Sequence, residues 1–318
     1  MIEERVHPDL KKYFQRLTEK NIDNVQELRA GDEREAVPVH ENIAITNRYI
    51  QGEEEHEIRL RMYANIEADQ GEKPCLLWIH GGGYISGKPE INDRLCQRFV
   101  LEANCTVVSV AYRLAPENPY PAALNDCYTA LKWITDHATE LKINPEKVAI
   151  AGVSAGGGLV AALSLLARDR KGPKIAFQMP LYPMIDNRIA TSSSQEISDL
   201  RIWNGIFTQK AWKHYLGDLP MESIDMYAVP SLAENYRNLP PTYTCVGDLD
   251  PFKDETLEYV QKLSEAGVPV EFHLYPGCFH GFESMVPEAA ISKKAESEYV
   301  SALRFAYRSI KLSYFCNN

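Results

Sequence analysis

Two glycine-rich segments, each directly after a short apolar run, constrain the fold of this chain more than any other feature. They are residues 80–84 (HGGGY) and residues 152–156 (GVSAG). The second is a G-x-S-x-G turn, which can present the hydroxyl of Ser154 on a sharp bend between a strand and a helix. The first can offer backbone N–H groups to an oxyanion that forms when the serine attacks a carbonyl. Together the two segments predict acyl-transfer chemistry.

Short, nearly continuous apolar runs alternate with helical stretches along most of the chain. Such runs are typical of parallel strands that are buried on both faces by helices. They predict strands at 75–79, 105–110, 148–151, 175–179, 242–246 and 270–275, preceded by an antiparallel edge pair at 43–46 and 57–63. Helices are expected at 91–103, 121–139, 155–169, 252–266 and 287–310. The predicted fold class is α/β, with a mostly parallel eight-stranded sheet flanked by helices.

One connection is longer than an ordinary crossover, since roughly fifty residues separate Asp186 from Asn238. Part of it, residues 208–216, has helical periodicity, with Thr208 as the expected N-cap. We interpret residues 188–225 as a helical cap insertion and residues 1–42 as N-terminal helices that contribute to the cap. The catalytic core then comprises residues 43–187 and 226–318. The cap is expected over the carboxyl ends of the strands, where open α/β sheets bind ligands.

A nucleophilic serine needs a base and an acid that orients the base, both from loops later in the chain. His280 follows the last predicted strand and is the expected base. Three acids share one loop, Asp248, Asp250 and Asp254. Asp254 is expected to lie in the following helix and point away, and Asp248 could bind local backbone amides. Position alone favours Asp250 modestly.

The oxyanion hole is expected from the backbone amides of Gly82, Gly83 and Ala155. Consecutive glycines allow the first two amides to turn toward the serine, and the third lies at a helix N-terminus, whose dipole favours negative charge. His80 is expected to hydrogen-bond within this loop and hold the glycine turn. Its predicted role is structural.

Four aromatic residues are expected to bind substrate, although amphipathic helices also bury such residues in ordinary packing. They are Tyr84, Trp203, Phe207 and Trp212.

The composition excludes several classes of partner. A formal net charge of −10 argues against nucleic acid and anionic membranes. The longest apolar stretch is too short to cross a bilayer, and the charged N-terminus has no apolar run that could serve as a signal peptide. Seven scattered cysteines without a CxxC pair suggest free thiols in a reducing compartment, hence a cytoplasmic protein without metal ligands.

Six segments, taken in order, resemble the α/β-hydrolase fold and, more narrowly, the hormone-sensitive-lipase-like esterases that bacteria carry. They are residues 80–83, 112–117, 121–123, 152–156, 250–255 and 280–282. In that family the acid is the first aspartate of a D-P-x-x-D-E segment, which is Asp250 here. The resemblance also implies oxyanion donors at Gly82, Gly83 and Ala155, a helical cap, and hydrolysis of short- to medium-chain carboxylic esters without a cofactor. The chain departs from the family pattern at Val153 and Ala111.

These observations predict a serine carboxylesterase acting on a small-molecule ester. An amidase or peptidase, or a carbohydrate acetyl esterase, would use the same triad, and a non-catalytic small-molecule receptor on the hydrolase fold is a further alternative. The triglycine loop favours esters, and the presence of all three triad residues argues against a receptor. A homodimer through the last strand is left open.

Overall fold

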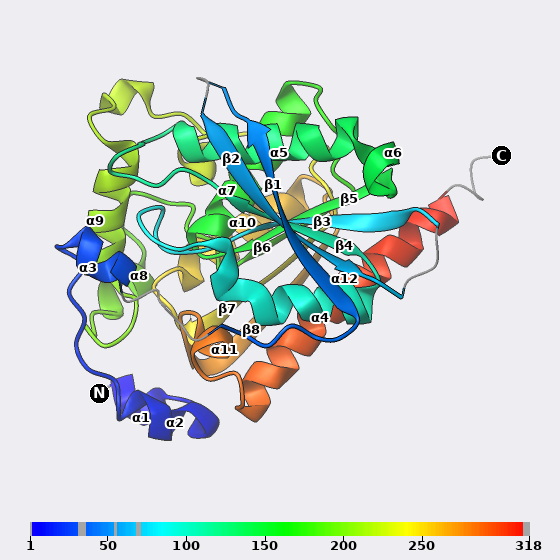
Figure 1. Ribbon diagram of the computed structural model, residues 1–318. Helices are drawn as coiled ribbons and strands as arrows, with labels where there is room; N and C mark the ends of the chain where they lie inside the picture. The colour runs from blue at the N-terminus through cyan, green and yellow to red at the C-terminus, as the bar shows by residue number, and fades with distance from the viewer. Residues whose placement is uncertain (1, 31–35, 54–55, 68–70, 314–318) are drawn as a thin grey trace.

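A single sheet organises the computed structural model, which describes residues 2–30, 36–53, 56–67 and 71–313 (Figure 1). The sheet has eight strands in the order β1-β2-β4-β3-β5-β6-β7-β8. Strand β2 pairs antiparallel with β1 and β4, and every other pairing is parallel. The strands are β1 (Ile43–Gln51), β2 (Glu57–Asn65), β3 (Lys73–Ile79), β4 (Thr106–Ala111), β5 (Ile143–Val153), β6 (Phe177–Leu181), β7 (Thr242–Leu249) and β8 (Val270–Phe279). The predicted mostly parallel, eight-stranded α/β fold is confirmed.

The helices and short 3-10 turns lie between and around these strands. They are α1 (Ile2–Arg5), α2 (Pro8–Phe14), α3 (Val25–Ala30), η1 (Pro89–Asn92), α4 (Asp93–Ala103), α5 (Ala122–Asp136), α6 (Ala138–Leu141), α7 (Ala155–Asp169), α8 (Ser192–Glu196), α9 (Gly205–Leu216), η2 (Met221–Ser223), η3 (Pro230–Leu232), α10 (Lys253–Glu265), α11 (Phe282–Met285) and α12 (Ala290–Ser313). Within the described part of the chain, no helix is both long and apolar enough to cross a membrane.

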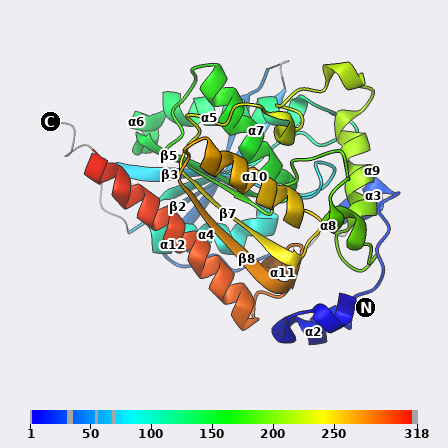
Figure 2. The same ribbon diagram turned by 180° about the vertical axis from the view of Figure 1, so that it is seen from behind.

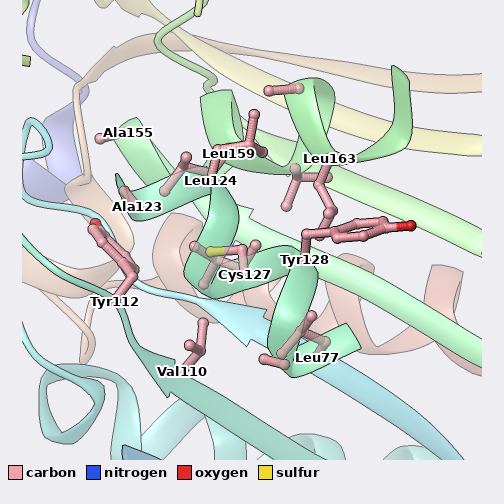
Figure 3. Close-up of a cluster of buried hydrophobic side chains, with 14 of the residues drawn as sticks. Leu77, Val110, Tyr112, Ala123, Leu124, Cys127, Tyr128, Ala155, Leu159 and Leu163 are labelled. Carbon is pink, nitrogen blue, oxygen red and sulfur yellow. The ribbon is translucent and has the colours of Figure 1, made fainter. Parts of the chain in front are cut away.

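The sheet is covered on both faces because its central strands are apolar on both. Successive side chains of a strand point to opposite faces, so β3 sends Leu77 and Ile79 into one core and Leu76 and Trp78 into the other. Helices α5 and α7 close the first core, where side chains from both helices meet those of β3 and β4 (Figure 3). Helices α4 and α12 lie side by side over the second (Figure 2).

Helices α3, α8 and α9 gather at one end of the molecule in both views (Figures 1 and 2). The N-terminal segment reaches this group through the N–H of Lys20, which donates to the carbonyl of Leu200 at 2.9 Å. An ion pair between Lys210 and Asp23 joins α9 to the same segment. The N-terminal residues and the long insertion are therefore packed together.

Helix α9 begins at Gly205, and the N-cap predicted at Thr208 is wrong. Asn204 is the N-cap, since its side-chain oxygen accepts a hydrogen bond from the N–H of Phe207 at 3.0 Å. Thr208 lies inside the helix, where its hydroxyl donates to the carbonyl of Asn204 and accepts from the indole N–H of Trp203. Asparagine caps helices as well as threonine does, and the apolar pattern alone did not show the first turn.

Candidate active site

Ser154 occupies the turn between β5 and α7, in a backbone conformation that is rare for a residue with a side chain (φ 58°, ψ −121°). The turn is held on both sides: the N–H of Ser154 donates to Leu181 O at 3.0 Å, and its carbonyl accepts from the N–H of Met184 at 3.0 Å. A Cβ at Gly156 would collide with the carbonyl of Ile79. Glycine there lets α7 start against the end of β3, which stabilises the strained serine.

Three side chains from separate loops meet at the carboxyl edge of the sheet. The Nε2 atom of His280 lies 2.8 Å from the hydroxyl oxygen of Ser154, and its Nδ1 atom lies 2.7 Å from Oδ2 of Asp250. Ser154 follows β5, Asp250 follows β7 and His280 follows β8. With Nδ1–H donating to the carboxylate, the free Nε2 can accept the proton of the serine hydroxyl. The structure thus brings together the three residues predicted as a triad.

The imidazole of His280 is fixed from several sides. Edge-on ring contacts come from Tyr182 at 5.0 Å and Phe252 at 4.9 Å. Asp250 is fully buried, and its second oxygen accepts the N–H of Phe252 at 2.9 Å. The carboxylate therefore has both oxygens hydrogen-bonded, which fixes the orientation of the imidazole.

The two other acids of this loop point elsewhere. Asp248 lies 3.6 Å from the guanidinium of Arg5 and is partly exposed, so its side chain is held by an ion pair at the surface. Asp254, on α10 as predicted, accepts the N–H of Ser193 at 2.8 Å. Asp254 thereby ties the short helix α8 of the insertion to the core.

The glycine loop after β3 lies beside the serine and is held by His80. The Nδ1 atom of His80 lies 2.8 Å from the carbonyl of Gly81, and its ring stacks on Tyr112 at 4.2 Å. Gly83 has φ 61°, and a Cβ there would come within 2.6 Å of the ring of Trp203. The amide of Ala155 is the first of α7, where N–H groups have no partner within the helix. These positions suit the predicted oxyanion donors.

Burial lowers the pKa of His80 to about 4, and this has a consequence for stability. In the unfolded chain the ring binds a proton near its ordinary pKa of 6.5, whereas the folded protein keeps it neutral. The contribution of His80 to the free energy of unfolding is therefore fully present above about pH 6.5. It is lost as the pH drops from there toward 4. We expect His80 to account for about 3 kcal/mol of the loss in unfolding free energy between pH 7 and pH 4.

Urea unfolding of the wild type and of His80→Gln at both pH values measures this contribution. The variant starts less stable at pH 7, because it loses the stack on Tyr112. It should then lose less stability on acidification than the wild type does. Equal losses in the two proteins would contradict the assignment.

A cleft of about 200 Å³ opens above the serine. Trp203 and Phe207 line it from the insertion, together with the glycine loop and His280. Tyr84 and Trp212 do not line it, which corrects their prediction as substrate-binding residues. The Tyr84 ring stacks on Tyr215 at 3.9 Å with its hydroxyl donating to Met184 O, and Trp212 packs against Tyr84. Both belong to the buried core, because one face of α9 packs onto the sheet helices.

The family model for the alpha/beta hydrolase fold matches residues 76–284. The chain belongs to this family. Within it, the order of its motifs and its relatives place the hydrolase in the hormone-sensitive-lipase-like branch, as the sequence predicted. The match covers the glycine loop, the turn that carries Ser154, and both Asp250 and His280.

Two curated relatives and one solved structure show how far the similarity of the hydrolase extends. The esterase LipI of Mycobacterium tuberculosis is 33% identical over 270 residues, covering 84% of this chain and 83% of that protein. An arylesterase of Saccharolobus solfataricus is 35% identical over 238 residues, covering 72% of this chain and 74% of that protein. The structure of a bacterial heroin esterase superposes with a TM-score of 0.92 at 35% identity, over 96% of this chain and 99% of that one.

Sequence reasoning missed several residues that shape the site of this hydrolase. Tyr182 lines the cleft and touches His280, and Lys20 and Leu28 line it from the N-terminal segment. Tyr182 directly follows strand β6, so the rule that ligands lie at the carboxyl ends of parallel strands could have singled it out. Glu283, three residues after His280, is also buried beside the site. Nothing in the sequence pattern distinguished it from an exposed glutamate.

Proposed function

We propose that this carboxylic ester hydrolase is a serine esterase, which cleaves short- to medium-chain esters through an acyl-enzyme on Ser154. The observation that carries the proposal is the continuous hydrogen-bonded chain from Ser154 through His280 to Asp250, with contacts of 2.8 and 2.7 Å. Its direct test is the loss of ester hydrolysis when Ser154 is replaced by alanine. Retained activity would refute it.

The reaction proceeds in two halves around one neutral imidazole. The Ser154 hydroxyl oxygen attacks the ester carbonyl as its proton passes to Nε2 of His280, and Asp250 stabilises the imidazolium that results. The tetrahedral oxyanion is held by the amides of Gly82, Gly83 and Ala155. His280 returns the proton to the alcohol oxygen as the C–O bond breaks. Water then attacks the acyl-enzyme with His280 again as base, releasing the acid.

Trp203 is proposed to limit the length of the acyl chain. Its ring lies against Gly83, its indole N–H is bonded to Thr208 at 3.0 Å, and it lines the cleft. This anchored ring closes the cap side of a cleft of only about 200 Å³, which suits short acyl groups.

Trp203→Ala is expected to raise kcat/KM for p-nitrophenyl octanoate relative to the acetate by about tenfold, because one or two methylenes of pocket space are worth that much. Rates on acetate, butyrate and octanoate esters measure the shift. Trp133→Ala, on α5 and outside the cleft lining, serves as the tryptophan control. An unchanged chain-length profile in Trp203→Ala would contradict the assignment.

The relatives named above are esterases, which favours ester over amide bonds for this chain. An amidase, a carbohydrate acetyl esterase and a receptor would each differ from the proposal in a simple assay with p-nitrophenyl acetate, the matching anilide and an acetylated sugar. A cytoplasmic location stays a prediction. It is supported by the six cysteines that the structure describes, which are all buried and form no disulfide with one another. The homodimer also stays a prediction. Strand β8, through which it would form, is an edge strand of the sheet.

A further inference from the structure

Tyr182 belongs to the segment that holds the nucleophile turn in place. The N–H and the carbonyl of Ser154 are bonded by Leu181 and Met184, which lie on either side of Tyr182 in the chain. Tyr182 itself has φ 35°, a left-handed conformation that costs energy for a residue with a side chain. Its N–H donates to the carbonyl of Cys245 on β7 at 2.8 Å, which helps to hold this conformation. Strained backbone of this kind gathers at functional sites, so the direction of the Tyr182 side chain calls for a reason.

The Tyr182 side chain reaches the base and a buried carboxylate at the same time. Its ring meets the ring of His280 edge-on at 5.0 Å, and its hydroxyl donates to Oε1 of Glu283. Tyr182 and Glu283 are only 3% and 2% exposed, so this hydrogen bond is shielded from water. The bond ties the turn after β6, which holds Ser154, to the turn after β8, which carries His280. The nucleophile and the base are thereby joined by a second connection besides their own hydrogen bond.

Glu283 can bring a negative charge into this buried region. Burial raises the pKa of Glu283 to about 7, while the hydrogen bond from Tyr182 and the charge of a protonated His280 favour the ionised carboxylate. The effect of His280 is mutual, because an imidazolium that stabilises a carboxylate is itself stabilised to the same extent. The imidazolium of His280 forms in both halves of the proposed reaction. A carboxylate at Glu283 therefore stabilises the charge that develops on the base.

The titratable side chains around Glu283 come from the two turns and from three neighbouring elements. They are Tyr182 after β6, Cys245 on β7, Cys278 on β8, His280 after β8, and Glu296 and Tyr299 on α12. Burial raises the pKa of both tyrosines and both cysteines, to about 12 for Cys278, so these four groups stay neutral in the working range of the enzyme. Of the six, only the charges of Glu296 and His280 can act on Glu283.

The charged groups near Glu283 are compensated by partners of their own. Glu296 is paired with Arg94 and, at 2.9 Å, with Arg98. A cavity of about 360 Å³ lies beside Glu283, and on its walls Arg61 is paired with Asp93, Glu90 is paired with Arg59, and Lys88 is exposed. Among these described neighbours, His280 is therefore the group whose change of charge Glu283 answers.

We propose that Tyr182 and Glu283 are positioning residues for His280: the Tyr182 ring fixes the imidazole, and the Glu283 carboxylate stabilises its protonated form. The inference rests on the proposed function, because it assigns these roles toward the base of that reaction. Asp250 acts on the imidazole by a direct hydrogen bond at Nδ1, whereas Glu283 acts on it by charge from the far side of the Tyr182 hydroxyl. Glu283 does not need to reach the substrate.

The test is the pH dependence of kcat in Glu283→Gln, a change that keeps an oxygen for the Tyr182 hydroxyl and removes the charge. Above about pH 8.5, where the carboxylate is ionised, the wild type should exceed the variant by about three- to tenfold, since stabilisation by one pKa unit is worth tenfold. Below about pH 5.5 the wild-type carboxyl is protonated, so the two rates should converge. Hydrolysis of p-nitrophenyl acetate, followed at the isosbestic wavelength of p-nitrophenol and corrected for the uncatalysed reaction, measures the ratio.

Three further variants assign the effect to this pair. Tyr182→Phe removes the hydroxyl and keeps the ring against His280. The pKa of Glu283 then rises, because the bond from Tyr182 lowers it, so the gain in kcat with pH should move to higher pH. Glu288→Gln, which removes an exposed carboxylate in the turn after α11, should match the wild type at every pH. Tyr236→Phe, which removes a buried hydroxyl bonded to a backbone carbonyl outside the cleft, should match it as well.

Two outcomes would overturn the inference while leaving the esterase intact. One is a ratio of wild type to Glu283→Gln that is the same at about pH 5.5 and about pH 8.5, because a packing role alone lowers kcat equally at every pH. The other is a Tyr182→Phe profile that coincides with that of the wild type. A wild-type protein that hydrolyses no ester would instead refute the proposed function, and the inference with it.

Discussion

Replacement of Ser154 by alanine is expected to lower kcat for p-nitrophenyl acetate by about 10⁵- to 10⁶-fold, the loss typical when a serine nucleophile is removed. The Ser154 hydroxyl is the attacking group, and among the residues that the structure describes no other hydroxyl is hydrogen-bonded to His280. The Ser154 hydroxyl lies 2.8 Å from His280, and alanine is small enough to fit the same buried turn. Initial-rate assays against the uncatalysed reaction measure the loss.

The matched control is Ser164→Ala, on helix α7, which starts directly after Ser154. It removes a buried hydroxyl that bonds Gln178 at 2.6 Å and lies outside the cleft lining. This variant should keep near wild-type kcat while losing some stability, whereas Ser154→Ala should lose kcat while keeping its unfolding midpoint. Activity in Ser154→Ala within a few fold of wild type would show that another group is the nucleophile.

Asp250→Asn is expected to lower kcat by about 10⁴-fold with little change in KM, the effect measured when the triad acid of a serine protease is made neutral. An asparagine amide can donate to Nδ1 of His280, which would leave the proton on Nε2. That tautomer cannot accept the proton of Ser154. The loss of kcat therefore comes from the wrong tautomer of His280 and not from a change in the geometry of the site.

Asp248→Asn is the matched control for this prediction, because it changes an acid two residues away in the same loop. Asp248 is partly exposed and contacts Arg5, so its replacement should change kcat by less than about threefold, the scale of an exposed ion pair. Steady-state kinetics of the two variants separate the candidates. A large loss in Asp248→Asn with a normal Asp250→Asn would reverse the assignment.

Much of the fold could be predicted because parallel strands leave a strong pattern. Residues 75–79 and 148–151 are apolar on both faces, and only a sheet covered on both sides accommodates such strands. The nucleophile turn was equally readable, since Gly152 and Gly156 flank the serine where the helix must approach the sheet closely. The choice of Asp250 over Asp248 rested on a family resemblance, because position alone separated them only modestly.

The packing of the long insertion was harder to predict, since tertiary contacts decide it. Helix α9 has aromatic residues on more than one side, and its sequence does not say which side faces the cleft. Phe207 and Trp212 both pack in the core, but only Phe207 also lines the cleft. Glu283 has no motif at all. Its burial beside the site is visible only in the folded structure.

The central claim is that Ser154 forms a covalent bond with the acyl group, and trapping with diethyl p-nitrophenyl phosphate tests it most directly. The reagent mimics the tetrahedral intermediate and stays attached to the attacking atom. Intact-mass measurement followed by peptide sequencing should find one diethylphosphoryl group per chain, on Ser154, with activity lost in proportion to labelling. Full inactivation with the label on another residue, or full activity after stoichiometric labelling of Ser154, would contradict the account.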